Sequence, residues 1–222
     1  MRLIPHLLNF FYRHLYHGLA FAYDAVAAVV SFGHWTEWTK ETLPFIQGTR
    51  LLELGHGSGH LQRALLDPSS SAKASPGLFV VGLDESSQMG RLAQRRIVRA
   101  GFASPRLIRG IVQALPFHAD TFDSIVASFP AEYIVDPRTL SEAHRVLRSG
   151  GRLIVLPAAW PKSRLLQWLY RVTGESPSEV VEIVKEKWSQ PFVRAGFEVS
   201  VETREVKSSV LLIILARKLT VK

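Results

Sequence analysis

Short apolar runs alternate with amphipathic segments along most of the chain after residue 48. Strands are predicted at 50–54, 78–83, 106–109, 122–128, 152–157, 197–206 and 209–216, and helices at 60–66, 88–100 and 140–147. Such alternation is typical of an α/β domain whose sheet is mostly parallel. Ser149, Gly150 and Gly151 are expected to form the turn that leads into the fifth strand.

Two stretches depart from this alternation. Residues 67–77 are rich in serine and proline and predict a turn-rich connection. Residues 158–190 carry Trp160, Trp168, Tyr170 and Trp188 on two predicted helices. We interpret 158–190 as a helical insertion over the sheet edge.

The first 47 residues form a predicted N-terminal element of their own, ahead of a domain at 48–222. Its apolar stretch is interrupted by Arg13, His14, His17 and Asp24, which leaves it too short to span a membrane. The polar interruptions also disfavour a secretory signal. Helical spacing predicts an amphipathic helix with one apolar face, formed by Leu3, Ile4, Leu7, Leu8, Phe11 and Leu15, and a second helix at 19–30. The pair either caps its own domain or lies in a lipid headgroup layer.

Composition narrows the function classes. The chain has 222 residues, which favours one domain with additions. It has no cysteine, which excludes disulfides, thiolate zinc sites and cysteine nucleophiles. Twenty-seven basic and 19 acidic residues give a net charge of +8, which predicts attraction to nucleic acid or to an anionic membrane.

The most informative motif follows the first predicted strand and reads Leu51-Leu52-Glu53-Leu54-Gly55-His56-Gly57-Ser58-Gly59-His60. Alternate glycines allow a sharp turn and a close approach of a ligand to the backbone. The spacing differs from the dinucleotide fingerprint, because His60 stands where the third glycine would be. The motif therefore disfavours a nicotinamide dehydrogenase.

A second motif ends the next strand, at Val80-Val81-Gly82-Leu83-Asp84-Glu85-Ser86. An acid at this position of an α/β sheet is placed to accept hydrogen bonds from ribose hydroxyls. The alternative is that Asp84 and Ser86 serve only as turn or helix-capping residues.

Together these motifs resemble the class I S-adenosylmethionine-dependent methyltransferases, in the type 11 or quinone C-methyltransferase-like branch. The likeness extends through 110–117, 122–128 and 142–156, and reaches Tyr23-Asp24, 31–35 and 192–197 outside the central span of 48–157. It implies a Rossmann-like seven-stranded sheet with an antiparallel last strand, helices on both faces, and S-adenosyl-L-methionine as cofactor. No metal is implied.

The resemblance also implies roles for individual residues. Cofactor contacts are expected from Tyr23, Glu53, Gly55, His56, Gly57, Ser58, Gly59, Asp84, Glu85, Met89, Val112, Gln113 and Ser128. The glycine loop and Glu53 would surround the methionine part, Asp84 the ribose, and Val112 and Gln113 the adenine. Ile111 departs from the family, which usually has an acid there. His56 also departs, since a cysteine or a small residue is usual.

The acceptor is less well defined by the sequence. Ser128-Phe129-Pro130-Ala131 differs from the Pro-Pro-aromatic run typical of methyltransferases that modify base or glutamine amines. The aromatic and apolar segments favour a lipophilic acceptor, such as a phospholipid amine or a quinone. The alternatives are an RNA or other small-molecule methyltransferase, or a cofactor-binding protein without activity.

Three further expectations concern the surroundings of the site. Candidate bases are His56, His60, His118 and Glu132, and none stands out. Arg91, Arg95, Arg96 and Arg99 form a basic stripe, either a solvated helix face or a phosphate contact. We expect a cytoplasmic protein and leave open its peripheral association with the inner face of an anionic membrane.

Overall fold

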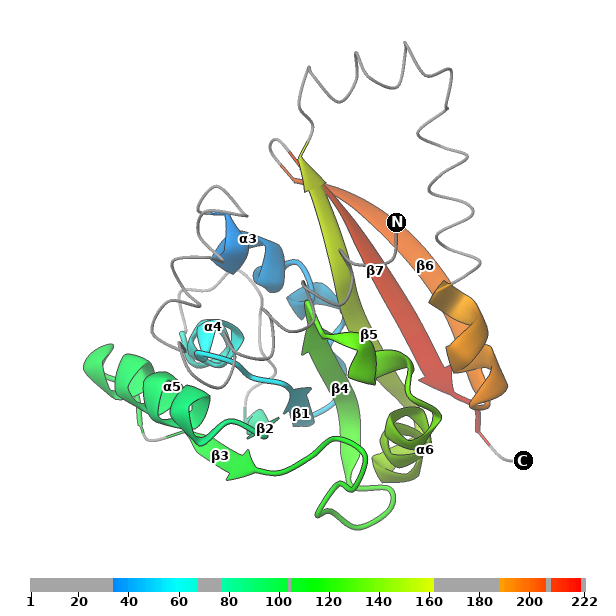
Figure 1. Cartoon of the computed structure of the whole chain (residues 1–222), viewed down its shortest axis with the longest axis horizontal. Coiled ribbons are helices and arrows are strands. Elements are labelled where there is room, and N and C mark those ends of the chain that lie inside the picture. The colour runs from blue at the N-terminus through cyan, green and yellow to red at the C-terminus, as the bar shows by residue number, and fades with distance from the viewer. Residues whose placement is uncertain (1–33, 68–76, 104, 162–187, 207–208, 221–222) are drawn as a thin grey trace, which may run out of the picture.

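A seven-stranded sheet in the order β3-β2-β1-β4-β5-β7-β6 organises the chain (Figure 1). The computed structural model describes residues 34–67, 77–103, 105–161, 188–206 and 209–220. The strands are β1 (Arg50–Leu54), β2 (Phe79–Asp84), β3 (Arg106–Arg109), β4 (Phe122–Ser128), β5 (Leu147–Pro161), β6 (Phe197–Val206) and β7 (Ser209–Lys218). The helices predicted before residue 31, Tyr23 and most of the predicted insertion lie outside the described residues.

The pairing of the strands confirms the predicted fold class. β1 pairs in parallel with β2 and β4, β2 with β3, and β4 with β5. β7 is antiparallel to both of its neighbours, β5 and β6. The carboxyl ends of β1 to β4 therefore meet at one edge, where ligands bind in open α/β sheets.

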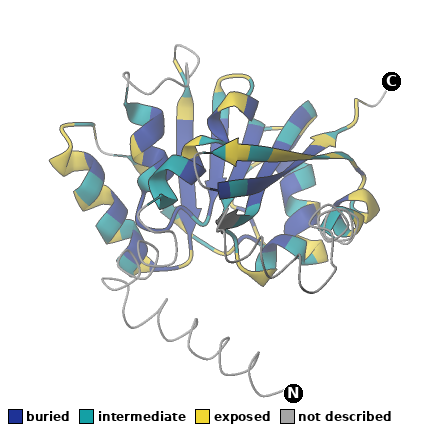
Figure 2. Ribbon diagram, turned by 90° about the horizontal axis from the view of Figure 1, so that it is seen from above, coloured by how far each residue is buried: buried dark blue, intermediate teal, exposed yellow. Residues whose placement is uncertain are grey.

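Helices cover both faces of the sheet (Figures 1 and 2). α3 (Trp35–Lys40), the 3-10 helix η1 (Leu43–Phe45) and α4 (His60–Leu66) contribute to the core on one face. The 3-10 helix η2 (Glu132–Val135), α6 (Pro137–Val146) and a helical segment at 188–194 contribute to the core on the other. α5 (Ser87–Arg99) packs on α4, β2 and β3.

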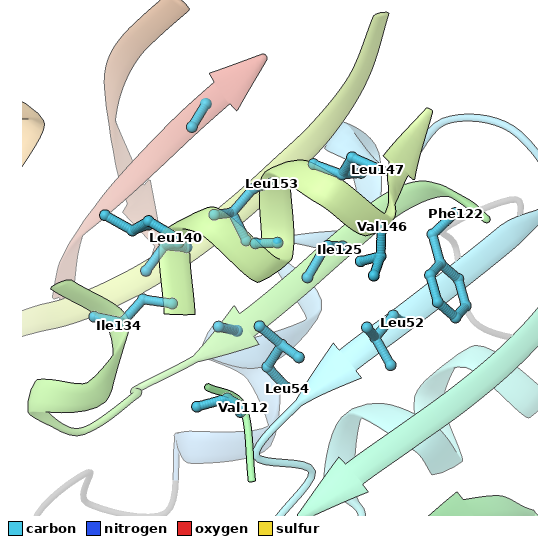
Figure 3. Packing of buried hydrophobic residues seen from close by; sticks show 14 of the residues in the cluster. Leu52, Leu54, Val112, Phe122, Ile125, Ile134, Leu140, Val146, Leu147 and Leu153 are labelled. Atoms are coloured by element: carbon cyan, nitrogen blue, oxygen red, sulfur yellow. The ribbon is translucent and has the colours of Figure 1, made fainter. Parts of the chain in front are cut away.

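Strand periodicity divides the apolar side chains between the two cores. Leu52 and Leu54 point into the cluster drawn in Figure 3, together with Ile125, Leu140 and Val146. Leu51, which precedes them on β1, points to the opposite face, toward Leu61 and Val126. Because both faces are buried, the central strands are nearly continuous apolar runs.

Two predicted boundaries in the β5 region are wrong. Residues 149–151 do not form a separate turn but lie within β5, at a register shift between Phe122 and Ser124 of β4. The insertion does not begin at 158, because Ala158 and Ala159 continue β5 and pair with Leu212 and Leu211. In both places pairing with a neighbouring strand overrides the local sequence signal.

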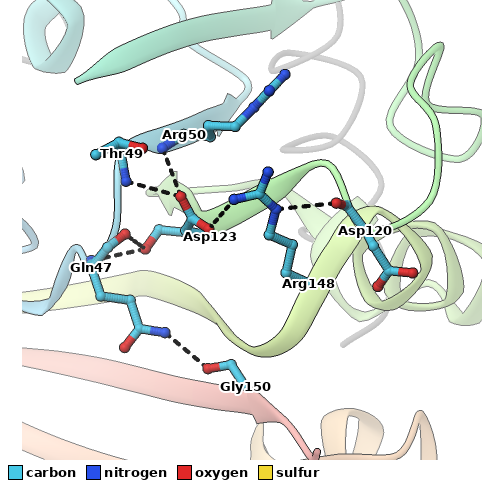
Figure 4. Close-up of polar contacts among 8 residues, drawn as sticks. Gln47, Thr49, Arg50, Asp120, Asp123, Arg148 and Gly150 are labelled. Carbon is cyan, nitrogen blue, oxygen red and sulfur yellow. Dashed lines mark hydrogen bonds and ion pairs between the residues drawn. The ribbon is translucent and has the colours of Figure 1, made fainter. Parts of the chain in front are cut away.

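Polar contacts fasten the amino edge of the sheet, opposite the glycine loop (Figure 4). Asp123 Oδ2 accepts hydrogen bonds from the N–H groups of Thr49 and Arg50, each at 2.9 Å, and Oδ1 pairs with Arg148 at 2.8 Å. Burial opposes ionisation, but these partners hold the pKa of Asp123 below its usual value. Gln47 adds a hydrogen bond of 2.9 Å to the carbonyl of Gly150. The starts of β1, β4 and β5 are thus tied together.

No helix within the described ranges is long and apolar enough to cross a membrane.

Candidate functional site

The glycine loop leaves β1 and turns sharply into α4. Gly55, Gly57 and Gly59 have φ angles of 67°, 52° and 83°, a region that favours glycine. A Cβ on Gly59 would lie 2.7 Å from the Cβ of Ala93, so this glycine allows α4 and α5 to pack closely. A Cβ on Gly57 would meet no heavy atom within 4 Å. Gly57 therefore borders open space at the carboxyl edge.

Asp84 braces two of the loops at this edge. Its Oδ2 accepts a hydrogen bond of 2.9 Å from the Gly57 N–H, and its Oδ1 accepts one of 2.8 Å from the Ser86 N–H. The helix cap of α5 is Ser86, whose Oγ accepts from the Met89 N–H at 3.3 Å. Asp84 thus holds the glycine loop against the end of β2. Ser86, and not Asp84, caps α5.

Glu53 lies beneath the loop and is 3% exposed. Its Oε2 accepts a 2.8 Å hydrogen bond from Gln62 Nε2. Burial raises the pKa of Glu53 to about 8; the Gln62 hydrogen bond opposes the rise and the charge of Asp84 adds to it. The buried carboxyl is therefore mostly protonated at neutral pH.

His56 is also buried, at 5% exposure. Its Nδ1 donates a 2.8 Å hydrogen bond to the carbonyl of Gly57. Burial lowers the pKa of His56 despite the opposing attraction of Asp84, so the ring is neutral at pH 7. Its observed role is to hold the loop conformation.

A cavity of about 430 Å³ lies beyond Asp84, between the loops that follow β2 and β3. It is lined by Glu85, Ser86, Ser87, Gln88, Arg109, Gly110 and Ile111. Ile111 is 51% exposed. The predicted neighbours Met89 and Val112 are buried instead, and Val112 belongs to the core cluster of Figure 3. Gln113 reaches Asp136, 3.5 Å away.

Aromatic side chains gather where β4 ends. Phe129 has φ of 48°, and its ring centroid lies 4.2 Å from that of Trp35 and 6.0 Å from that of Trp38. The Tyr133 hydroxyl donates to the carbonyl of Leu54 at 3.4 Å and covers Gly55, where a Cβ would lie 2.5 Å from it. We call Trp35, Trp38, Phe129 and Tyr133 the aromatic mouth. A backbone held in the left-handed region by a bulky residue is a form of strain common at functional sites.

Ser128 stands beside the aromatic mouth. Its Oγ is buried and makes no hydrogen bond within the described part of the chain. A buried hydroxyl without a partner is costly and points to a missing ligand or water.

The candidate bases separate in space. His118 is exposed and precedes β4, so it lies toward the amino edge, away from the glycine loop. His60 Nδ1 shares a 2.9 Å hydrogen bond with Thr36 Oγ1, which joins α3 to α4. Glu132 is exposed on η2. The ranges described hold no group of three or more side chains suited to bind a metal ion.

Three contributors were not predicted as parts of the site. Gln62 and Tyr133 reach it from α4 and η2. Arg96 was seen only as part of a basic stripe, but its Nη1 donates to Ser58 O at 2.6 Å and to Ser58 Oγ at 2.8 Å. A lone glutamine among leucines on a short buried helix is the one sequence signal that points to Gln62.

A family model described as the ubiE/COQ5 methyltransferase family matches residues 10–175, three quarters of the chain. The chain belongs to the ubiE/COQ5 methyltransferase family. This confirms the resemblance drawn from the glycine loop, the acid after β2 and the segments that follow.

Curated relatives carry quinone methyltransferase names. The chain is 34% identical over 161 residues to a demethylmenaquinone methyltransferase of Symbiobacterium thermophilum, covering 70% of this chain and 62% of the relative. It is 29% identical over 221 residues to one of Thermotoga maritima, covering 85% and 88%. It spans less than two thirds of the Symbiobacterium relative's length.

Solved structures share the fold. A SAM-dependent methyltransferase from Methanosarcina mazei superposes with a TM-score of 0.55 at 20% identity, covering 80% of this chain and 96% of the other. At this identity the likeness concerns the fold alone.

Proposed function

We propose that this ubiE/COQ5 family member transfers a methyl group from S-adenosyl-L-methionine to a carbon of a lipophilic, quinone-like acceptor. The observation that carries the proposal is the meeting of an open glycine loop with the aromatic mouth at one edge of the sheet. The demethylmenaquinone methyltransferase names of two relatives support the class of acceptor.

The residues at the edge fit this cofactor. Gly57 leaves room for a ligand against the backbone, and the Ser128 Oγ lacks a partner within the described residues. We infer that Gly55, Gly57 and Glu53 hold the methionine part, with Asp84 toward the ribose hydroxyls. The cavity at Ile111 then takes the adenine, whose edge meets an apolar side chain.

When bound, the cofactor supplies a methyl group on a positively charged sulfur. The task of the chain is to align the acceptor carbon with that methyl group and to exclude water, since orientation alone can be worth about 7 to 11 kcal/mol. Trp35 and Phe129 offer flat apolar surface to an aromatic acceptor ring. Removal of the ring proton needs a base, and we assign that role to none of the described residues.

Membrane association is part of the proposal. The net charge of +8 and the apolar pattern of the first 15 residues support peripheral binding at the cytoplasmic face, where a lipophilic acceptor resides. Vesicle co-sedimentation tests it: binding should rise with the anionic lipid fraction and fall with salt. A Leu7→Glu, Phe11→Glu variant that remains folded yet binds as well as the parent would contradict a lipid-facing helix.

The function is tested by following labelled methyl groups from S-adenosyl-L-methionine into reduced demethylmenaquinone, extracted phospholipids and RNA. We expect transfer to the quinone alone. Asp84→Ala should weaken cofactor binding by about 1 to 3 kcal/mol, measured by calorimetry. Transfer to phosphatidylethanolamine or RNA would show that the acceptor is not a quinone. Binding of S-adenosyl-L-methionine without transfer to any of the three pools would show that the chain only binds the cofactor.

A further inference from the structure

A second cavity lies away from the aromatic mouth, between α4 and α5. It has a volume of about 450 Å³ and is lined by Arg63, Leu92, Arg95, Arg96, Arg99 and Ala100. We call it the arginine groove. Four guanidinium side chains from two helices thus converge on one concave surface.

No acidic side chain on either helix balances this charge. The sequences of α4, HLQRALL, and α5, SQMGRLAQRRIVR, contain no aspartate or glutamate. Arg63, Arg95 and Arg99 are exposed, and none of the three makes a hydrogen bond or an ion pair with another described residue. The acid nearest to these helices in sequence is Asp67, the residue that follows α4, and it does not line the cavity.

Two ordinary explanations cover only part of the groove. Arg96 and Arg99 lie in the last turn of α5, where the helix dipole favours cations. The same argument covers Arg63, which lies in the last turn of α4, but it does not reach Arg95, one turn before Arg99. A merely solvated helix face is convex, whereas these arginines surround a cavity. Repulsion among like charges this close makes an anion the favoured occupant.

Guanidinium groups select the anion. Each presents a planar fork of donors that matches two oxygens of a phosphate group, so several can bind one phosphate from different sides. Leu92 adds apolar surface to the wall of the groove.

The groove is linked to the glycine loop through one side chain. Arg96 lines the groove and donates from Nη1 to both the carbonyl and the hydroxyl of Ser58, which stands between Gly57 and Gly59. An anion that draws on Arg96 changes how firmly that guanidinium holds the loop.

We propose that the arginine groove binds a phosphate group, supplied by an anionic lipid headgroup or by a soluble phosphate, and that Arg96 couples its occupancy to the glycine loop. The coupling rests on the proposed function, because the loop is taken to hold the cofactor. The phosphate site itself does not depend on it.

The site is tested on the full chain without cofactor, by calorimetric titration of inorganic phosphate and by co-sedimentation with phosphatidylglycerol vesicles. The groove variant is Arg63→Gln with Arg99→Gln. The control is Arg194→Gln with Arg217→Gln, two exposed arginines outside the groove that remove the same charge. We expect the groove variant to bind either probe at least about tenfold more weakly than the control.

Each outcome decides the proposal. If the groove variant loses phosphate binding, the phosphate group comes from a soluble ligand. If it loses only vesicle binding, the phosphate group comes from a lipid headgroup. Either result supports the site. Equal weakening in the two variants overturns it, since only net charge would then matter. Failure of the parent to bind either probe also overturns it, as does groove-dependent binding of an RNA oligomer alone. Melting curves exclude unfolding as the cause, and Arg63→Lys with Arg99→Lys, which keeps the charge, should restore less than full affinity.

The coupling has its own readout. Affinity for S-adenosyl-L-methionine is measured with and without saturating phosphate, in the parent and in Arg96→Gln. We expect phosphate to shift the affinity of the parent and not that of the variant. An unchanged parent affinity, with phosphate bound, removes the coupling and leaves the site. If the cofactor does not bind at all, the proposed function fails while the groove result stands.

Discussion

At the scale of single residues, the site is governed by how each polar side chain is buried. Glu53 is the last but one residue of β1 and Asp84 is the last residue of the neighbouring parallel strand β2; both are 3% exposed, yet their surroundings differ. Asp84 accepts hydrogen bonds from two backbone N–H groups, whereas Glu53 accepts one from the side chain of Gln62. One carboxyl thus braces the loops, while the other is mostly protonated at neutral pH.

The raised pKa of Glu53 predicts a pH dependence of stability. Its pKa is about 8 in the folded chain against 4.5 for the free group, so between these values the unfolded state releases a proton that the folded state retains. The free energy of unfolding should therefore fall as pH rises, by up to about 1.4 kcal/mol per pH unit from this group. Urea denaturation at several pH values measures it.

Glu53→Gln should flatten that slope, because the amide cannot ionise and its oxygen can still accept from Gln62. Glu198→Gln, at an exposed position on β6, serves as control and should leave the slope unchanged. Parallel pH profiles for the parent and Glu53→Gln would show that Glu53 is ionised in the folded chain.

Gly57→Ala, compared with a control glycine of similar φ, distinguishes the loss of space for a ligand from the cost of backbone strain. The new Cβ enters the open space beside the loop, so cofactor affinity should fall at least about tenfold, or about 1.4 kcal/mol. Gly101→Ala is the control, since Gly101 also has positive φ and an unobstructed Cβ position but follows α5. Both variants should lose about 1 to 2 kcal/mol of stability. Equal affinities in the two would place the ligand elsewhere.

At the scale of elements, α5 shows how a local signal positions the site. Its N-cap Ser86 lines the cavity beyond Asp84, and its buried face of Met89, Ala93 and Ile97 packs inward. The start of the helix and the wall of the cavity are therefore set by the same residue.

Ser86→Ala should lower stability by about 1 kcal/mol, because the Met89 N–H loses its acceptor. Ser87→Ala, one position on and exposed, should change stability by much less. Thermal unfolding of the two variants makes the comparison. A similar loss for both would mean that the Ser86 hydroxyl does not cap α5.

Elements with strong local signals could be predicted from the sequence. β1, α4, β3, β4 and β6 begin and end where predicted, because clear periodicity is bounded there by turn residues. β5 could not, since Gly150 and Gly151 look like a turn until pairing with β4 absorbs them. The roles of the glycine loop and Asp84 could be predicted because their motifs are local in the sequence. The role of Tyr133 could not, because its hydrogen-bond partner Leu54 is 79 positions away.

At the scale of the whole molecule, the two edges of the sheet differ: polar contacts tie strands together at the amino edge, and the glycine loop borders open space at the carboxyl edge. Asp123 ties the start of β1 to β4 and, through Arg148, to β5, as Figure 4 shows. Phe129, with its positive φ, and the unpartnered Ser128 Oγ lie at the other edge of the described sheet, although the amino edge also has a positive φ at Asp120 and an unpartnered Arg50 Nε.

Asp123→Asn tests this support. Loss of the carboxylate charge should cost about 1.5 to 3 kcal/mol near neutral pH. Because the pKa of Asp123 is lower in the folded chain than in the unfolded chain, its carboxylate stabilises the fold fully above the unfolded-state pKa. This stabilisation is lost as pH falls through the folded-state pKa. The gap between parent and variant should therefore close in acid, below about pH 4.

The matched control for Asp123→Asn is Glu202→Gln, which removes one carboxylate charge from an exposed position on β6. Its stability should stay close to that of the parent at every pH. Urea denaturation across the acid range compares the three chains. A gap between the parent and Asp123→Asn that is constant with pH would mean that shape, and not charge, is what Asp123 contributes.

The order of strands in the sheet has a consequence for biosynthesis. β7 is made after β6 but lies between β5 and β6. Until it emerges, the long apolar edge of β5 has no neighbour on that side, and such an edge is prone to pair with other chains. A chain paused before residue 209 has its parallel strands but cannot close its sheet. We therefore expect that synthesis of β7, with its run Val210-Leu211-Leu212-Ile213-Ile214-Leu215, protects the nascent protein from aggregation by covering the edge of β5.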